Sequence, residues 1–255
     1  MRYAIIGFGK MGKLYDRLLN ADFIVDLISI QSKIYFSNLE EFLYYHPQVD
    51  LVIVATPTRT HYQIVKKLLE SNYNVLCEKP LCLFVHECKK LEKLAEKKKL
   101  ILYQSTLERF NPVIKFINKN FNLKNVNKVT SIRFGKKPFE TEGVLPVYDL
   151  GIHDVDLWFY LFNKKVIWEV YTGYGDKKRE IKLYLNDNSI IVADLLNKKV
   201  TISSKVINLA SEMNNPILEM IDYIKVNKLR VNEKWSEQID LLRLSKDNVL
   251  ILEPL

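Results

Sequence analysis

The clearest chemical pattern lies in the first twelve residues. Gly7, Gly9 and Gly12 form a G-x-G-x-x-G loop directly after the apolar run Tyr3–Ile6, and they are three of only eight glycines in the chain. In such a loop the first glycine permits a tight turn, the second lets the backbone approach a pyrophosphate, and the third lets the next helix pack closely. The N–H groups at the start of that helix attract phosphate. The loop therefore predicts a dinucleotide site, with an unliganded glycine turn as the alternative.

The second predicted strand bears on how an adenosine ribose would be held. Dinucleotide-binding folds often place Asp or Glu at the end of this strand, where the carboxylate holds a ribose hydroxyl. The apolar pattern predicts a strand over Phe23–Ile30, so Asp26 falls inside it and the strand ends near Gln31, Ser32 and Lys33. We expect Ser32 and Lys33 to meet a 2′-phosphate instead. The missing acidic residue slightly favours NADP over NAD.

Polar residues also follow two later apolar runs, at 51–55 and 74–77. Ligands of an open parallel sheet lie at the carboxyl ends of its strands, which is where these residues would fall. A charged pair directly after a buried strand is hard to explain as core, although a solvated turn is the alternative. The expected cofactor-binding residues are Gly7, Phe8, Gly9, Lys10, Met11, Gly12, Ser32, Lys33, Thr56, Pro57, His61, Glu78 and Lys79.

A second polar pattern, Asp149 with His153, is suited to proton transfer. Both residues lie in a helix-like segment over 146–162, and with Asp156 they follow the spacing i, i+4, i+7. Residues at this spacing share one face of a helix. A carboxylate one turn from a histidine can orient the imidazole ring and stabilise its charged form, as a general base requires. The alternative is an ordinary surface pair on a helix.

The order of the predicted elements indicates how these residues are positioned. Strand-like and helix-like segments alternate along residues 1–110, which predicts a doubly wound parallel sheet. From about residue 126 the pattern changes to strands separated by turns, interrupted by the helix over 146–162. The expected fold class is α/β: a Rossmann domain over 1–110, then a smaller C-terminal α+β domain over 111–255 with an open, mostly antiparallel sheet.

Composition argues against several other classes of protein. Hydrophobic residues make up 48% of the chain and charged residues 27%, as in ordinary globular proteins. No apolar run reaches the length of about 18 residues that spans a membrane, and the first residues lack the long apolar stretch of a signal peptide, so we expect a cytoplasmic protein. The net charge of +8 includes a lysine-rich amphipathic helix over 89–99 rather than a nucleic-acid groove. Three irregularly spaced cysteines predict neither disulfides nor a metal site.

Four motifs in sequence, GFGKMG, ATPTRTH, CEKP and DLGIHDVDL, resemble the glucose–fructose oxidoreductase, inositol dehydrogenase and MocA family over roughly residues 1–165. The resemblance implies a Rossmann domain and a second domain whose open sheet forms an oligomer interface, so we expect a homo-oligomer. It assigns catalytic roles to Lys79, Asp149 and His153, and it implies a cis bond before Pro80. Members are usually longer; the missing residues would fall after the second strand and in the C-terminal sheet.

A finer resemblance comes from the stretch L-E-R-F-N-P at Leu107–Pro112. It is similar to the branch of the family that oxidises the 3-hydroxyl of UDP-N-acetylated hexoses or their uronic acids. The resemblance implies that Arg109 and Asn111 face the substrate, although Asn before Pro is also a good helix start. The expected substrate-binding residues are Lys79, Arg109, Asn111, Asp149 and His153.

These patterns together predict an NAD(P)-dependent oxidoreductase that transfers a hydride to or from a hydroxyl-bearing carbon of a sugar or nucleotide sugar. His153 would move the hydroxyl proton, Asp149 would orient His153, and Lys79 would stabilise the alkoxide. An imine or tetrapyrrole reductase on the same scaffold is one alternative. A non-catalytic NAD(P)-binding interaction module is another, because a fold alone does not determine function.

Overall fold

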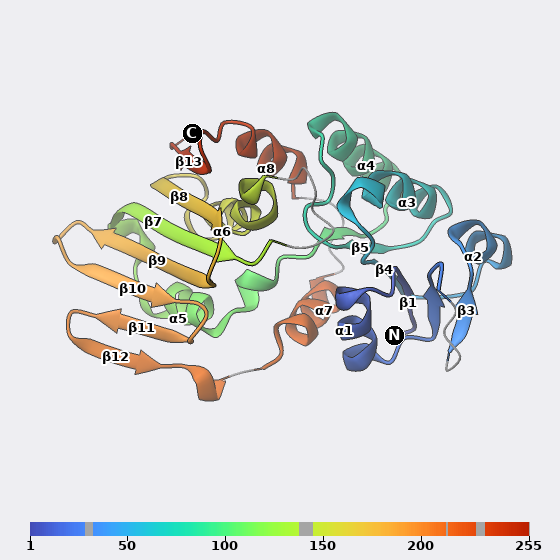
Figure 1. The fold of residues 1–255 in the computed structure, drawn as a ribbon, viewed down its shortest axis with the longest axis horizontal. Helices are drawn as coiled ribbons and strands as arrows, with labels where there is room; N and C mark the ends of the chain where they lie inside the picture. Colours follow the sequence, from blue (N-terminus) through green and yellow to red (C-terminus); the bar gives the residue numbers. More distant parts are fainter. Residues whose placement is uncertain (29–32, 138–144, 213, 228–232, 255) are drawn as a thin grey trace. The chain divides into compact units, whose positions relative to one another are not determined.

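The computed structural model describes residues 1–28, 33–137, 145–212, 214–227 and 233–254. The chain folds into two compact units (Figure 1). The first consists of Met1–Ser105 with Met220–Glu237, and the second of Thr106–Glu219 with Gln238–Leu255. The first division of the chain falls close to the predicted boundary at 110. The predicted second domain runs continuously over 111–255, whereas this division groups Met220–Glu237 with the first unit.

A six-stranded parallel sheet forms the first unit. Its strands are β1 (Tyr3–Ile6), β2 (Phe23–Val25), β3 (Ile34–Phe36), β4 (Leu51–Val54), β5 (Val75–Cys77) and β6 (Leu102–Gln104). Their spatial order is β3-β2-β1-β4-β5-β6, with β1 paired in parallel to both β2 and β4. This is the strand order of dinucleotide-binding folds, in which the ligand lies where the order reverses, at the carboxyl ends of the central strands. The predicted Rossmann sheet is confirmed.

Burial explains the composition of the central strands. Every residue of β1 and β4 is buried, so their sequences are continuous apolar runs rather than alternating ones. The connecting helices are α1 (Lys10–Leu19), α2 (Leu39–Tyr45), α3 (Thr58–Glu70) and α4 (Val85–Lys98). They are amphipathic, and α3 buries Val65, Leu68 and Leu69 while its lysines and glutamate remain exposed or half-buried. The polar stretches between strands and helices are therefore left to line the ligand edge of the sheet.

The second strand is shorter than the sequence predicts. It ends at Val25, not at Ile30, and Asp26 is the first residue after it. The carboxylate of Asp26 accepts hydrogen bonds from the backbone N–H groups of Phe8 (2.6 Å) and Ile28 (3.0 Å). Asp26 therefore ends the strand, and its carboxylate binds the N–H groups of the glycine loop and of the turn that follows the strand.

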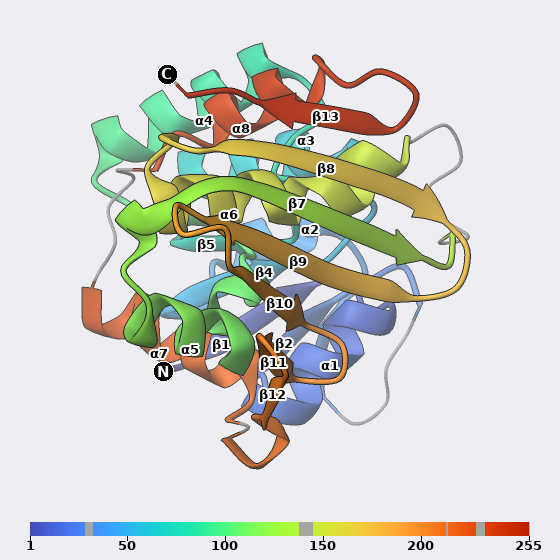
Figure 2. The ribbon, with the colours of Figure 1, turned by 90° about the vertical axis from the view of Figure 1, so that its left-hand side faces the viewer.

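A seven-stranded mixed sheet forms the second unit, in the order β12-β11-β10-β9-β7-β8-β13. Its strands are β7 (Val126–Gly135), β8 (Ile167–Tyr174), β9 (Lys178–Leu185), β10 (Ile190–Asp194), β11 (Lys199–Ile202), β12 (Lys205–Asn208) and β13 (Val249–Leu252). Among these described strands only β7 and β8 pair in parallel, because a helix connects them. In Figure 2, helix α6 (Ile152–Phe162) lies behind β7 and β8, and helix α5 (Pro112–Asn120) is drawn to the left of β10. The predicted open, mostly antiparallel sheet is confirmed.

Two late helices, α7 (Pro216–Asn227) and α8 (Trp235–Leu242), account for the returning segment. Within the first unit, the rings of Trp235 and Tyr103 pack in a T-shaped arrangement, with 5.5 Å between the ring centroids. The backbone N–H of Ser236 donates to Glu92 of α4 at 2.7 Å. Trp235 and Ser236 therefore attach this late segment to the first unit, through one aromatic contact and one hydrogen bond.

The described part of the chain contains no helix long and apolar enough to span a bilayer. Among the same residues no group of three or more His, Cys, Asp or Glu side chains is placed to hold a metal ion. The three cysteines, Cys77, Cys82 and Cys88, are unoxidised and buried. Burial raises the pKa of the Cys77 thiol well above its ordinary value, which keeps it protonated and unreactive.

Candidate active site

The glycine loop has the geometry that its sequence predicts. Gly7 has a φ of +90°, and a Cβ there would lie 2.8 Å from the backbone of Ala55. A Cβ at Gly12 would lie 2.0 Å from the carbonyl oxygen of Gly7, so α1 can pack against the loop only through glycine. Contacts within the protein therefore explain both of these glycines.

Gly9 is different, because nothing in the described part of the protein requires it to be glycine. Its φ is −71°, which any residue can adopt, and an added Cβ would meet no described heavy atom within 4 Å. Gly9 is also the N-cap of α1, whose first residues are Lys10 and Met11 and whose first turn contains no acidic side chain. Bare N–H groups at a helix start, with open space above them, fit a pyrophosphate. The loop thus fits a dinucleotide.

Asp26 occupies the place for which the sequence predicts no acidic residue. It follows β2 directly, and its Oδ2 accepts the N–H of Phe8 inside the glycine loop. This is where dinucleotide-binding folds place the acid that holds the adenosine ribose. The predicted absence of an acidic residue is therefore wrong, and that absence no longer favours NADP. The sequence signal was present, but the overlong strand prediction hid it.

The residues expected to meet a 2′-phosphate do not both fall within the described chain. Ser32 lies outside the described residues. The ammonium group of Lys33 donates to Asn20 Oδ1 (2.7 Å) and to the carbonyl oxygen of Ala21 (3.0 Å), and it lies 3.2 Å from Asp16. Lys33 is thus bound to the C-terminal end of α1, opposite the end that follows the glycine loop.

His61 lies between the loops that follow β4 and β5. Its Nε2 is 2.8 Å from the carbonyl oxygen of Thr56, and its Nδ1 is 2.9 Å from that of Pro80. The residue is 1% exposed, and burial lowers its pKa against the opposing effect of these two carbonyls. Both ring nitrogens face protein atoms, so His61 joins the loop after β4 to the loop after β5. Pro57 caps α3 beside it.

Glu78 and Lys79 follow β5, and the bond between Lys79 and Pro80 is cis, as the resemblance implies. The hydroxyl of Tyr15, on α1, donates to Glu78 Oε1 at 2.7 Å and lies 3.2 Å from Ser105 Oγ. Burial and the neighbouring Glu78 raise the pKa of Tyr15 well above its ordinary value, so its hydroxyl stays protonated and can donate. Tyr15 and Ser105 were not predicted, because nothing local marks them.

Gln104 supports the same loop from the neighbouring strand. Its side-chain oxygen accepts the backbone N–H of Leu81 at 2.8 Å, and both residues are buried. Glu78 N–H in turn donates to the carbonyl oxygen of Val54 at 2.8 Å. The backbone is therefore held on both sides of Lys79, by hydrogen bonds to β4 and to β6. These two strands together determine where the backbone of Lys79 lies.

In the second unit, Asp149 lies in a π-helical turn, Val147–Gly151, that leads into α6. His153 is the second residue of α6, and both side chains are half-buried. A Cβ at Gly151 would lie 3.0 Å from Val147 and 3.4 Å from Thr172, so this turn packs closely on β8. Short π-helical segments occur frequently at functional sites. The ordinary helical spacing used for Asp149 and His153 therefore does not apply between them, although both lie at the same helix start.

Arg109 and Asn111 have partners inside the second unit. Arg109 Nε donates to Asp156 Oδ2 at 2.8 Å, and its Nη2 donates to Oδ1 at 2.5 Å. The Asn111 amide donates to Glu108 (3.0 Å) and to the carbonyl oxygen of Leu195 (3.2 Å), while its oxygen caps α5. Both residues are buried, at 6% and 4% exposed. The expectation that Asn111 contacts substrate is not supported, and its alternative role as a helix start is confirmed.

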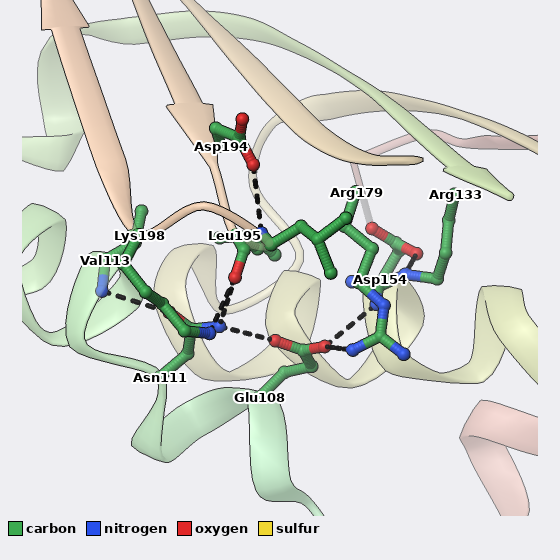
Figure 3. Close-up of polar contacts among 10 residues, drawn as sticks. Glu108, Asn111, Val113, Arg133, Asp154, Arg179, Asp194, Leu195 and Lys198 are labelled. Atoms are coloured by element: carbon green, nitrogen blue, oxygen red, sulfur yellow. Dashed lines mark hydrogen bonds and ion pairs between the residues drawn. The ribbon is translucent and has the colours of Figure 1, made fainter. Parts of the chain in front are cut away.

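A buried network of charges surrounds these residues (Figure 3). Arg133 of β7 donates through Nε to Asp154 Oδ2 (2.6 Å) and through Nη1 to Glu108 Oε1 (2.9 Å). Arg179 of β9 donates to the same Glu108 oxygen at 3.0 Å. Burial opposes ionisation of Glu108, but Arg133 and Arg179 outweigh it and hold its pKa below the ordinary value. The sequence did not reveal this network, because its members are far apart along the chain.

Strand order, glycine loop and Asp26 together define a Rossmann-type dinucleotide-binding fold. Residues 1–106 match the oxidoreductase family with an NAD-binding Rossmann fold, the family that includes glucose–fructose oxidoreductase, inositol dehydrogenase and MocA. The match covers the N-terminal segment of the chain, which is less than half of its 255 residues.

Two relatives are informative. The chain is 25% identical over 183 residues to the rhizopine catabolism protein MocA of Rhizobium meliloti, covering 64% of this chain and 58% of that protein. It is 24% identical over 218 residues to UDP-N-acetylglucosamine 3-dehydrogenase of Acidithiobacillus ferrooxidans, covering 78% of this chain and 67% of that protein. Matched segments span 41–58% of the length of the first three curated relatives, or about half.

Solved structures extend the similarity of fold to the second unit. The structure of the same Acidithiobacillus ferrooxidans dehydrogenase matches with a TM-score of 0.78 and 18% identity, covering 95% of each chain. GenD2 from gentamicin A biosynthesis, solved in complex with NAD, matches with a TM-score of 0.70 and 15% identity, covering 99% of this chain and 96% of that one. At these identities the comparison shows the fold alone.

Proposed function

We propose that this protein is an NAD-dependent dehydrogenase that transfers a hydride to or from a hydroxyl-bearing carbon of a sugar or nucleotide sugar. The observation that carries the cofactor part is the glycine loop, in which Gly9 faces open space above the bare N–H groups of α1. The match of residues 1–106 to an oxidoreductase family supports oxidoreductase chemistry. The nucleotide-sugar part is supported by the similarity to UDP-N-acetylglucosamine 3-dehydrogenase.

Asp26 is the reason for proposing NAD rather than NADP. Its carboxylate lies at the end of β2 and hydrogen-bonds to the glycine loop. A carboxylate there can accept a ribose hydroxyl but would repel a 2′-phosphate. The neighbouring Lys33, which could have offset that repulsion, is paired with Asp16. Asp26 therefore takes the place of Ser32 and Lys33 in the proposed ribose site.

The proposed chemistry gives a separate role to each of three residues. A bound nicotinamide supplies or accepts the hydride. His153 takes or returns the substrate hydroxyl proton, and Asp149 orients its imidazole ring. Lys79 donates a hydrogen bond to the reacting oxygen and stabilises the developing negative charge. Its anchored backbone supports this role, because a hydrogen-bond donor stabilises a transition state best when it is held in place before the reaction.

A homo-oligomer that associates through the second sheet completes the proposal. The sheet face that lies opposite α5 and α6 has no described helix over it, as Figures 1 and 2 show. Exposed apolar side chains on its strands include Phe134, Ile167, Tyr171, Ile190 and Ile251. The same strands carry the ion pair between Lys128 and Glu169 (2.8 Å), so the exposed apolar side chains lie among charged ones. Exposed apolar groups rimmed by polar residues mark surfaces that partners cover. The proposed partner is a second copy of this chain.

The proposal is tested by titrating the purified protein with NADH and NADPH and then adding UDP-N-acetylhexoses. We expect tighter binding of NADH, followed by a change in its absorbance band when the correct sugar nucleotide is present. His153→Asn should lower turnover by about 100-fold or more while cofactor affinity is unchanged, as for other general acid–base groups. Unchanged turnover in this variant would remove His153 from the mechanism.

The other results would point to the alternatives. Reduction of an imine or a linear tetrapyrrole, with no reaction on sugars, would favour a reductase on the same scaffold. Cofactor binding without turnover across free sugars, inositols and sugar nucleotides would favour a non-catalytic module. Failure to bind either cofactor would refute the site itself, since Gly9 would then have no ligand.

A further inference from the structure

Arg133 connects three elements of the second unit at a single buried point. Its guanidinium group lies between the carboxylates of Asp154 on α6 and Glu108 on the 3₁₀ turn Leu107–Phe110. Arg133 is 1% exposed, Asp154 0% and Glu108 5%. Figure 3 shows Asp154 and Glu108 reaching the two sides of this guanidinium group. Buried ion pairs of Arg133 therefore connect β7 to α6 and to the 3₁₀ turn.

Asp154, the residue of α6 that Arg133 binds, is next to the proposed base His153. Asp154 follows His153 directly, and Asp156 is held by the two hydrogen bonds from Arg109. Successive residues of an α-helix are separated by about 100° around its axis, so Asp154 and Asp156 point to nearly opposite sides. Holding both carboxylates prevents α6 from rotating about its axis. The direction in which His153 leaves the helix is then determined as well.

Stability alone is a poor explanation for this arrangement. A buried ion pair is often no more stabilising than apolar side chains of the same size, because both charges lose their hydration. Burial raises the pKa of Asp154, and Arg133 offsets this only in part. The link also lies directly after the π-helical turn, where the regular hydrogen bonding of an α-helix is interrupted. A helix start of this kind needs an external contact to set its orientation.

We propose that Arg133 is a positioning residue that sets the orientation of His153 through Asp154, and that the L-E-R-F-N stretch orients the histidine helix rather than contacting substrate. This deepens the proposed function, on which its kinetic test rests. Glu108 and Arg109 are adjacent in the sequence, and one acts on Asp154 through Arg133 while the other acts on Asp156 directly.

The test compares two arginine-to-lysine variants of the same network. Arg133→Lys keeps the charge, but one ammonium group cannot reproduce a guanidinium that donates in two directions. We expect kcat to fall by roughly 10- to 100-fold, with cofactor affinity unchanged, as for a misplaced catalytic group. Arg179→Lys is the matched control, because Arg179 binds Glu108 but no α6 carboxylate among the described residues, and it should keep wild-type kcat.

A second readout does not depend on turnover. The chain has only four histidines, so NMR of their ring protons can follow each titration, with His153 assigned by its loss in His153→Asn. Arg133→Lys should move the His153 titration midpoint by about 0.5 pH unit or more and leave His46 and His86 unchanged, because only the surroundings of His153 change. If the wild type has no dehydrogenase activity, the proposed function fails while this measurement still decides the positioning role.

A double variant guards against loss of folding in Arg133→Lys. Arg133→Met with Asp154→Leu replaces the ion pair by apolar side chains, which proteins often tolerate well. We expect this variant to fold, to bind cofactor and to show the same loss of kcat and the same shift of His153. Wild-type kcat together with an unshifted His153 in either folded variant would overturn the proposal, since the charged link would then be dispensable.

Discussion

At the scale of single residues, Gly9 is the glycine of the loop that packing within the protein does not require. Gly7 and Gly12 are explained by close contacts within the protein, because a Cβ at these positions would have neighbours at 2.8 Å and 2.0 Å, whereas a Cβ at Gly9 would have none within 4 Å among the described atoms. A glycine that the fold does not require is best explained by a group that approaches from outside. The three glycines of one motif therefore predict three different responses to substitution.

Gly9→Ala should leave the melting temperature nearly unchanged, because the new methyl group enters open space and costs at most about 1 kcal/mol at a helix N-cap. It should weaken NADH binding at least roughly tenfold, since the methyl group keeps a pyrophosphate from the backbone. Gly12→Ala is the contrast, and we expect it to lower the melting temperature markedly or to prevent folding. The checks are thermal unfolding and NADH fluorescence titration. Equal NADH affinity in Gly9→Ala and the wild type would argue against a phosphate site at this loop.

At the scale of elements, the second unit is held together by charges that no single segment contains. Glu108 accepts hydrogen bonds from β7 through Arg133, from β9 through Arg179, and from Asn111 at the start of α5. Both of its carboxylate oxygens are used, so it acts as an anion that the surrounding elements share. This explains how a carboxylate that is 5% exposed can remain ionised.

The charge of Glu108 should make stability depend on pH in a defined direction. Its folded-state pKa lies below the ordinary value of 4.5, so its stabilisation is complete above that value and is lost as pH falls through the folded-state pKa. Glu108→Gln should lower the free energy of unfolding by about 3 kcal/mol at neutral pH, because two arginines lose a buried partner. The difference from wild type should shrink as pH falls below 4.5.

Urea unfolding of both proteins at a series of pH values provides this comparison. Glu40→Gln is a suitable control, because Glu40 forms an ion pair with Lys67 in which both side chains are largely exposed, and such pairs contribute little. A difference between Glu108→Gln and wild type that stays constant down to the lowest pH would mean that the shape of the side chain matters there, and not its charge.

At the scale of the whole molecule, the second sheet has two unlike faces. Side chains such as Val129, Ser131 and Arg133 alternate along β7 with exposed or half-buried ones, so one face is core and the other is not. Gly173 allows the Phe134 ring to lie against the neighbouring strand, since a Cβ there would be 3.1 Å from that ring. An uncovered sheet face that carries aromatic and branched side chains is the basis of the proposed self-association.

Tyr171→Lys should shift the protein toward the monomer, because it places a charge within the proposed interface, where its desolvation is unfavourable. Tyr171 is 39% exposed on β8, and Tyr44, 85% exposed on α2 of the first unit, is the matched control position. Sedimentation velocity over a range of protein concentrations measures the effect. A wild-type protein that is monomeric throughout that range would rule out the interface, and a Tyr44→Lys variant that dissociates equally would place it elsewhere.

Much of the first unit could be predicted because its determinants are local. The run 51–54 is buried on both faces and is recognisable as a strand by itself, and the glycine loop follows β1 without interruption. The cis bond before Pro80 was implied by the motif and is present. The end of β2 was not predictable in the same way, because the residue that ends it is bonded to Phe8, eighteen positions earlier.

Contiguous residues and regular spacing were thus enough to predict the class of fold, the glycine loop and the family that residues 1–106 match. Which polar residues are available to a ligand depended on the folded chain. Arg109 and Asn111 resemble substrate contacts in sequence, but their partners Asp156 and Leu195 lie 47 and 84 positions away and hold them in the interior. A charged side chain is available to a ligand only when no nearer partner satisfies it, and folding brings such partners together from distant parts of the sequence.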